Sequence, residues 1–119
     1  MLNPPERPLR QLNNLPYVVG GNSTARLKRW LNSIGVIDYY HLALNVESIA
    51  PEEIWKSAEY LARTLSHVPM IFSVGTFAHK VLDKASLKHG ALPSTKVRDQ
   101  KQINKALDEC RNYLLGRYR

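Results

Sequence analysis

Residues 68–82 read VPMIFSVGTFAHKVL, and this stretch predicts the fold class of the chain. Its first seven residues form an apolar run that is typical of a buried strand. Gly75 and Thr76 interrupt the run, and apolar residues return at helical spacing from Phe77 onward. The pattern therefore indicates a strand, a tight turn and a helix in succession, which is the repeating unit of an α/β protein.

The same alternation continues toward the N-terminus. Apolar residues at helical spacing predict a helix that is capped by Asn22 or Ser23 and ends before Gly35. Residues 41–46 then form a short apolar run, which predicts a buried strand with Asn45 near its carboxyl end.

Further elements follow on both sides of residues 68–82. Residues 51–65 predict a second helix with a favourable first-turn proline. Residues 89–93 predict a third strand, and residues 103–114 form the apolar face of a predicted last helix. Strands that alternate with helices in this way predict an α/β fold in three layers, a short, mostly parallel sheet flanked by helices. We expect one domain over residues 1–119, in which residues 1–21 are a Pro- and Asn-rich loop that could close over the site described next.

This architecture predicts where a ligand binds. Open α/β sheets bind ligands in the crevice at the carboxyl ends of their strands. In this chain those ends are residues 45–47, 73–75 and 93–95.

The composition narrows the class of protein. The chain has 119 residues, of which 44% are hydrophobic and 23% charged, as in an ordinary folded domain. Its one cysteine, Cys110, forms no internal disulfide and offers no thiolate cluster for a metal. The histidines His41, His67, His79 and His89 lack the spacing of metal ligands, so neither a metal nor another cofactor is predicted. No apolar run is as long as a membrane span and the N-terminus does not read as a signal peptide, so we expect a cytoplasmic protein without a membrane partner.

The charge balance points to a polyanionic partner. Seventeen Lys and Arg against ten Asp and Glu give a net charge of +7. Lys96 and Arg98 lie in the segment expected to border the crevice, and Lys101 follows on the last helix. Basic residues at these positions are suited to phosphate contacts, and nucleic acid is the first candidate partner.

The order of several short motifs resembles the uracil-DNA glycosylase superfamily. The matching segments are Asn3-Pro4, residues 16–20 (PYVVG), residues 44–46 (LNV), residues 71–82 and residues 92–94 (LPS). In that family a Gly-x-Asn-Pro type motif at a strand end precedes a Pro-Phe-Val-Gly-like segment, and a His-Pro-Ser or Asn-Pro-Ser loop comes last. The resemblance covers nearly the whole chain.

The resemblance implies a role for individual residues. Asn3 would position the hydrolytic water, Tyr17 would stack on a base flipped out of DNA, and Asn45 would hydrogen-bond the Watson–Crick edge of that base. Phosphate contacts are expected at Gly20, Gly75, Ser94, Lys96, Arg98 and Lys101. Each role has a structural alternative: Tyr17 could be a core aromatic, Asn45 a turn residue, and Gly75 and Ser94 parts of tight turns.

Two departures from the family keep a second function open. Leu92 stands where the last motif carries His or Asn, and leucine cannot stabilise charge on a leaving base. Only Met1 and Leu2 precede Asn3, whereas a central strand precedes this motif in the family. Three explanations are open: the fold lacks that strand, a partner chain supplies it, or the assigned start of the chain is late. The chain is therefore a DNA glycosylase or an inactive module that binds nucleic acid or a nucleotide. A protein partner or a second copy at an exposed sheet edge is a further possibility.

Overall fold

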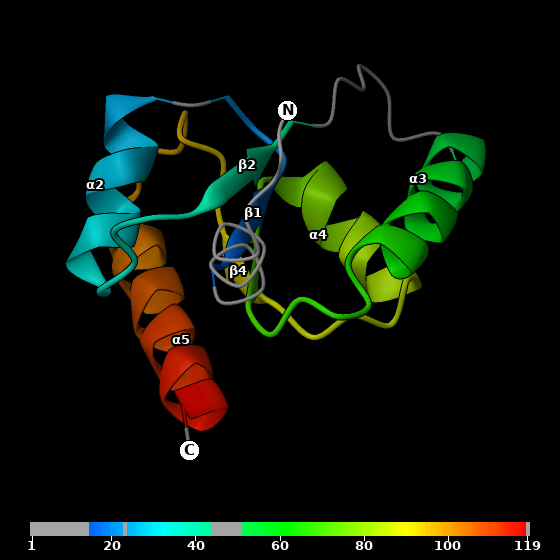
Figure 1. Ribbon diagram of the computed structural model, residues 1–119. Coiled ribbons are helices and arrows are strands. Elements are labelled where there is room, and N and C mark those ends of the chain that lie inside the picture. Colours follow the sequence, from blue (N-terminus) through cyan, green and yellow to red (C-terminus); the bar gives the residue numbers. More distant parts are fainter. Residues whose placement is uncertain (1–14, 23, 44–50, 119) are drawn as a thin grey trace, which may run out of the picture.

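Four short strands form one parallel sheet, and helices alternate with them along the chain (Figure 1). The computed structural model describes residues 15–22, 24–43 and 51–118. Within these residues the elements are β1 (Tyr17–Val19), α2 (Ala25–Ser33), β2 (Tyr40–Leu42), α3 (Pro51–Thr64), β3 (Ile71–Val74), α4 (Thr76–Lys84), β4 (Gly90–Leu92) and α5 (Gln100–Tyr118). The predicted α/β class is confirmed, and the sheet is entirely parallel.

The strands lie in the order β2, β1, β3, β4. In this register Val18 of β1 lies between His41 of β2 and Phe72 of β3, and Phe72 lies opposite Gly90 of β4. The chain passes from β1 outward to β2 on one side and from β3 outward to β4 on the other. The direction of winding therefore reverses between the two central strands.

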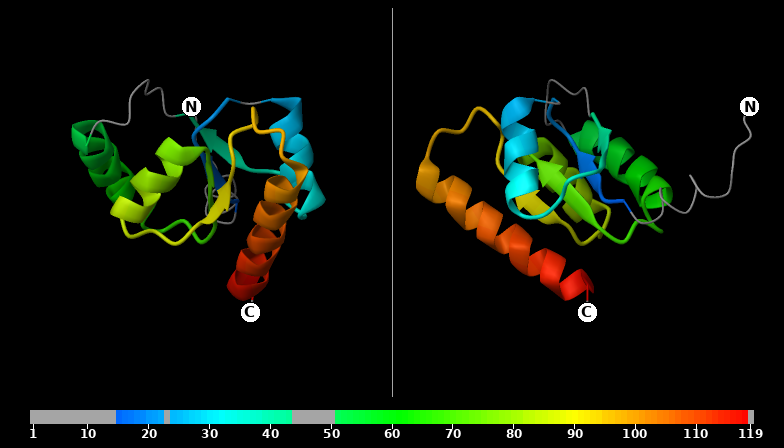
Figure 2. Two further views of the ribbon diagram at one scale, coloured as in Figure 1. Left: turned by 180° about the vertical axis from the view of Figure 1, so that it is seen from behind. Right: turned by 60° about the vertical axis from the view of Figure 1, so that its left-hand side comes forward.

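The helices cover both faces of the sheet. Figures 1 and 2 show α2 and α5 on one face and α3 and α4 on the other. Because successive strand residues point to opposite faces, Val18 and Phe72 pack with α2 and α5, whereas Val19 and Ile71 pack with α3 and α4. Burial on both faces explains why the strands read as continuous apolar runs without polar alternation.

Local chemistry sets both ends of α2. The Thr24 hydroxyl accepts a hydrogen bond of 3.1 Å from the Leu27 N–H, which caps the first turn. At the other end Gly35 adopts a φ of +93°, and the Val36 N–H bonds to the Leu31 carbonyl at 2.9 Å. This is a glycine-terminated helix end in which backbone carbonyls find partners. The cap is therefore Thr24, not Asn22 or Ser23.

The largest correction concerns the N-terminal segment. Residues 1–21 were expected to form a loop, but Tyr17–Val19 is β1, a central strand of the sheet. Val18 and Val19 are fully buried. A run of three residues between Pro16 and Gly20 is too short to show a periodicity, so its place in the sheet is set by pairing with β2 and β3.

The bounds of two strands differ from the prediction within the described residues. The strand predicted at residues 41–46 is β2, which spans Tyr40–Leu42, and residues 44–50 lie outside the described part of the chain. The strand predicted at residues 68–74 begins only at Ile71. Among the described residues, no helix combines the length and apolar character that crossing a bilayer requires.

Candidate functional site

The loops that follow β1 and β3 lie next to each other at the carboxyl edge of the sheet. Val19 pairs with Ser73, so β1 and β3 end almost level. Gly20 and Gly21 follow β1, and Gly75 follows β3. In an open parallel sheet this is the position at which ligands bind, because the two connections leave in opposite directions.

Gly20 is in tight contact with the β3–α4 segment. It has a φ of +93°, and a Cβ atom at this position would lie 2.6 Å from the Ala78 Cβ and 2.8 Å from the Val74 carbonyl oxygen. The Gly20 N–H donates to the Leu42 carbonyl at 2.8 Å, and its own carbonyl accepts a hydrogen bond of 2.8 Å from His41 Nε2. The loop is therefore held on one side by β2 and on the other by β3 and α4.

Gly75 joins β3 directly to α4. Its φ of +89° is a left-handed conformation that favours glycine, and its N–H donates to the Leu92 carbonyl at 3.0 Å. No side chain caps the first turn of α4. The free N–H groups of such a turn carry partial positive charge, which suits an anion.

A cavity of about 340 Å³ opens beside the end of β4. It lies between the start of α4 and the first half of α5, and His79, Ser94 and Lys105 contribute to its wall. Ser94 is a turn residue whose hydroxyl accepts a hydrogen bond of 3.2 Å from the Lys96 N–H. The next carbonyl, that of Thr95, accepts a hydrogen bond from the Arg26 guanidinium of α2.

The basic residues predicted to contact phosphate lie at the same edge. Lys96 and Arg98 are exposed in the loop between β4 and α5, and Lys101 is exposed in the first turn of α5. The Asp99 carboxylate accepts a hydrogen bond of 3.0 Å from the Lys101 N–H and so caps this helix. The structure thus brings Lys96, Arg98 and Lys101 to the carboxyl edge that also carries Gly20, Gly75 and Ser94.

The residues expected to contact a base are not brought together in the described part of the chain. Tyr17 begins β1, so it lies at the amino end of that strand, about 7 Å along the strand from its last residue. Its ring packs against that of Tyr40, with a centroid distance of 5.4 Å. Asn3 and Asn45 fall outside the described residues.

Leu92, at the position of the family's His or Asn, is part of the core. It is 3% exposed and packs with Phe72 and with α5. The nearby Ser73 is fully buried, and its hydroxyl has no hydrogen-bond partner among the described residues. Neither side chain offers a charge or a donor to the open edge.

A cluster that the sequence reasoning missed joins α4 to the segment before β4. His79 and Asp83 are four residues apart and so share one face of α4, and His89 lies against both. The spacing of four residues on a helix could have indicated that His79 and Asp83 lie close together. The approach of His89 could not be predicted in this way, because it depends on the turn between α4 and β4. Burial lowers the pKa of His89, which favours its neutral form.

Comparisons of this chain with models of protein families, with curated protein sequences and with solved structures find no match.

Proposed function

We propose that the carboxyl edge of the sheet binds nucleic acid and recognises a base, as in the uracil-DNA glycosylase superfamily that the sequence resembles. In this proposal the helix-flanked sheet is a small form of that superfamily's fold. The observation that carries the proposal is the reversal of winding between β1 and β3, which sets the loops at Gly20 and Gly75 side by side. Ligands of open parallel sheets bind at such a reversal.

The charge at this edge supports a polyanionic ligand. Lys96, Arg98 and Lys101 are exposed there, and the chain as a whole carries a net charge of +7. The uncapped first turn of α4 adds N–H groups at the same edge. Contacts of this kind bind phosphate without regard to sequence and lose affinity as salt rises.

A second asparagine is a candidate for the role expected of Asn3. In the family a Gly-x-Asn-Pro type motif stands at a strand end, and Gly20-Gly21-Asn22, which is followed by Ser23 and not by proline, comes directly after the central strand β1. Asn22 is exposed at this edge. We therefore propose that Asn22 aligns the hydrolytic water, and the test below includes both asparagines. Tyr17 has no part in the proposal, because its ring packs against Tyr40.

The burial of Leu92 favours a second candidate function. The side chain of Leu92 is a hydrocarbon, so it can neither donate a hydrogen bond to a leaving base nor carry charge. It is also only 3% exposed, so it lies in the core and not at the open edge. The same edge would then bind nucleic acid or a nucleotide without cleaving it. The two candidates share the binding surface and differ only in the chemistry that follows.

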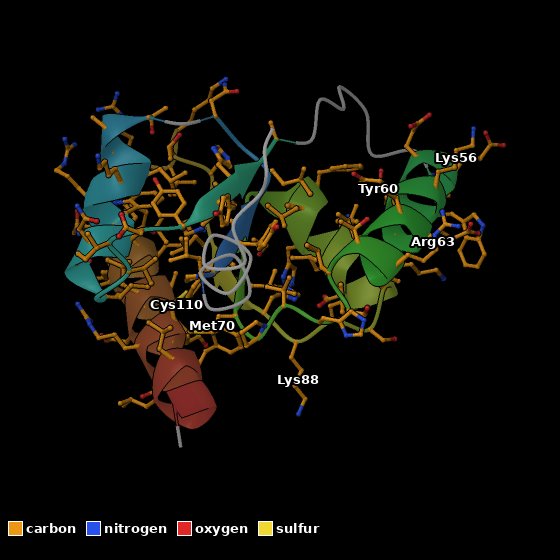
Figure 3. All side chains as sticks on the ribbon, in the orientation of Figure 1. Lys56, Tyr60, Arg63, Met70, Lys88 and Cys110 are labelled. Carbon is orange, nitrogen blue, oxygen red and sulfur yellow. The ribbon has the colours of Figure 1, made fainter. Side chains whose placement is uncertain are left out.

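Binding is tested first, by the fluorescence anisotropy of labelled uracil-containing DNA, single- and double-stranded, at increasing salt. We expect the double variant K96A/R98A to bind more weakly, and the slope of log affinity against log salt to fall by about 0.7–0.9 for each phosphate that the variant no longer neutralises. The matched control is R63A/K88A, which removes the same charge from the C-terminal part of α3 and from the loop before β4 (Figure 3). Failure of the wild-type protein to bind at low salt, or an equal loss of affinity in both double variants, overturns the proposal.

Catalysis is tested separately by following abasic-site formation in duplexes that contain uracil or a mismatch. If the protein is an enzyme, Asn22→Ala lowers the rate about a hundredfold or more, while DNA binding is kept. The parallel variant Asn3→Ala shows which asparagine acts. Binding without product in the wild-type protein supports the non-catalytic module.

A further inference from the structure

The side chains of His79, Asp83 and His89 point to one small volume beside β4. His79 and Asp83 lie on adjacent turns of α4, and His89 is the residue immediately before β4. The His89 side chain is 5% exposed, whereas those of His79 and Asp83 are 46% and 59% exposed. The cluster therefore has a buried base and an open side.

Potential ligand atoms of the three side chains lie close to one another. His79 Nδ1 lies 3.0 Å from His89 Nε2, His79 Nε2 lies 3.3 Å from Asp83 Oδ2, and His89 Nε2 lies 3.6 Å from Asp83 Oδ1. With one donor atom from each residue, the three atoms lie within 4.8 Å of one another. Ligands held about 2.0–2.1 Å from a tetrahedral zinc ion are about 3.3–3.4 Å apart, so binding would shorten the widest separation between the three donor atoms by up to about 1.5 Å.

The hydrogen bonding of His89 prepares it as a ligand. Its Nδ1–H donates to the Leu87 carbonyl at 2.8 Å, which leaves the lone pair of Nε2 directed toward His79 and Asp83. Metal-binding histidines commonly donate their second ring N–H to a carboxylate, a backbone carbonyl or a water molecule, which fixes the orientation of the ring. The Asp83 carboxylate supplies the negative charge that partly offsets a divalent cation.

Space is available for a further ligand. A cavity of about 540 Å³ adjoins the three side chains and is also lined by Ser86 and Tyr113. Lys88 lines it too, but Figure 3 shows its side chain extending away from the ribbon. Three protein ligands leave one position of a tetrahedral ion for water or an exogenous group.

We propose that His79, Asp83 and His89 bind one divalent transition-metal ion, Zn²⁺ before others, and leave its fourth coordination position open to solvent. Two imidazoles and one carboxylate suit Zn²⁺ better than Ca²⁺ or Mg²⁺, which prefer oxygen ligands alone. The proposal is independent of nucleic-acid binding.

The test uses the full chain without a purification tag, treated with a chelator and titrated with Co²⁺ as a spectroscopic substitute for Zn²⁺. We expect saturation at one equivalent, a strong visible absorption of the tetrahedral type, and its loss when Zn²⁺ displaces Co²⁺. In Asp83→Asn and His89→Gln the apparent Kd rises by roughly tenfold or more. In His67→Gln, the control at an exposed histidine elsewhere, the Kd is unchanged.

Thermal unfolding with and without Zn²⁺ separates metal binding from a structural role of the cluster. We expect Zn²⁺ to raise the Tm of the wild-type protein and of His67→Gln, and at the same Zn²⁺ concentration to raise that of Asp83→Asn less, because the stabilisation by a ligand of the folded state falls as its Kd rises. The absence of stoichiometric binding by the wild-type protein, or equal affinity in Asp83→Asn and His67→Gln, overturns the proposal.

Discussion

At the scale of single residues, two glycines with the same backbone angle are predicted to respond differently to substitution. Gly20 and Gly35 both have a φ of +93°, but a Cβ on Gly20 would meet the Val74 carbonyl and Ala78, whereas nothing lies within 4 Å of one on Gly35. We expect Gly35→Ala to lower the free energy of unfolding by about 1 kcal/mol through backbone strain alone. Gly20→Ala adds overpacking and costs about 3 kcal/mol or more. Urea unfolding measures both, and equal losses of stability would show that the loop after β1 does not pack against α4.

At the scale of elements, Cys110 reports whether α5 packs on the sheet. Figure 3 labels this side chain. It is fully buried, its Sγ lies 3.7 Å from the Ala91 carbonyl oxygen, and burial raises the pKa of the thiol to about 12. Because only the thiolate reacts, alkylation of the folded protein should stay slow from pH 7 to 10, while the rate in urea rises about tenfold per pH unit up to about pH 8.5. As pH rises, the thiol loses its proton in the unfolded protein before it does so in the folded protein. Ionisation of Cys110 therefore lowers the free energy of unfolding as pH rises from about 8.5 toward 12. Mass spectrometry of the single cysteine follows the reaction, and rapid labelling of the native state at pH 8.5 would contradict the packing.

At the scale of the whole molecule, the two helix layers should unfold together. The central strands contribute to the hydrophobic core on both faces of the sheet. Val18 and Phe72 pack against the α2/α5 layer, and Val19 and Ile71 pack against the α3/α4 layer. Trp30 is 8% exposed in the α2/α5 layer, whereas Trp55 on α3 is 54% exposed. In Trp55→Phe we therefore expect the fluorescence of Trp30 and the circular dichroism of all helices to follow one urea transition. Two separate midpoints would mean that the layers are independent.

The sequence was most informative where local chemistry acts. The helix that begins at Pro51 with two acids in its first turn, and the strand–glycine–helix unit around Gly75, were both predicted and are present. Propensity, capping and a contiguous apolar run are properties of neighbouring residues, so these elements needed no knowledge of the rest of the chain.

The sequence was least informative where partners are distant along the chain. The three-residue strand β1 became recognisable only through its pairing with β2 and β3. His89 joins His79 and Asp83 only because the chain turns between α4 and β4. The place of Asn22 at the carboxyl edge could not be predicted either, because it depends on the strand that precedes this residue.

The sequence by itself determined the α/β class, most of the helices and the positive charge, because each follows from composition or from residues within one or two turns of each other. Only the tertiary structure decided the strand order, the pairing of the loops at Gly20 and Gly75, and the approach of His89 to α4. The physical reason is that these features arise from the burial of both faces of a central strand, and burial depends on segments far apart in the sequence.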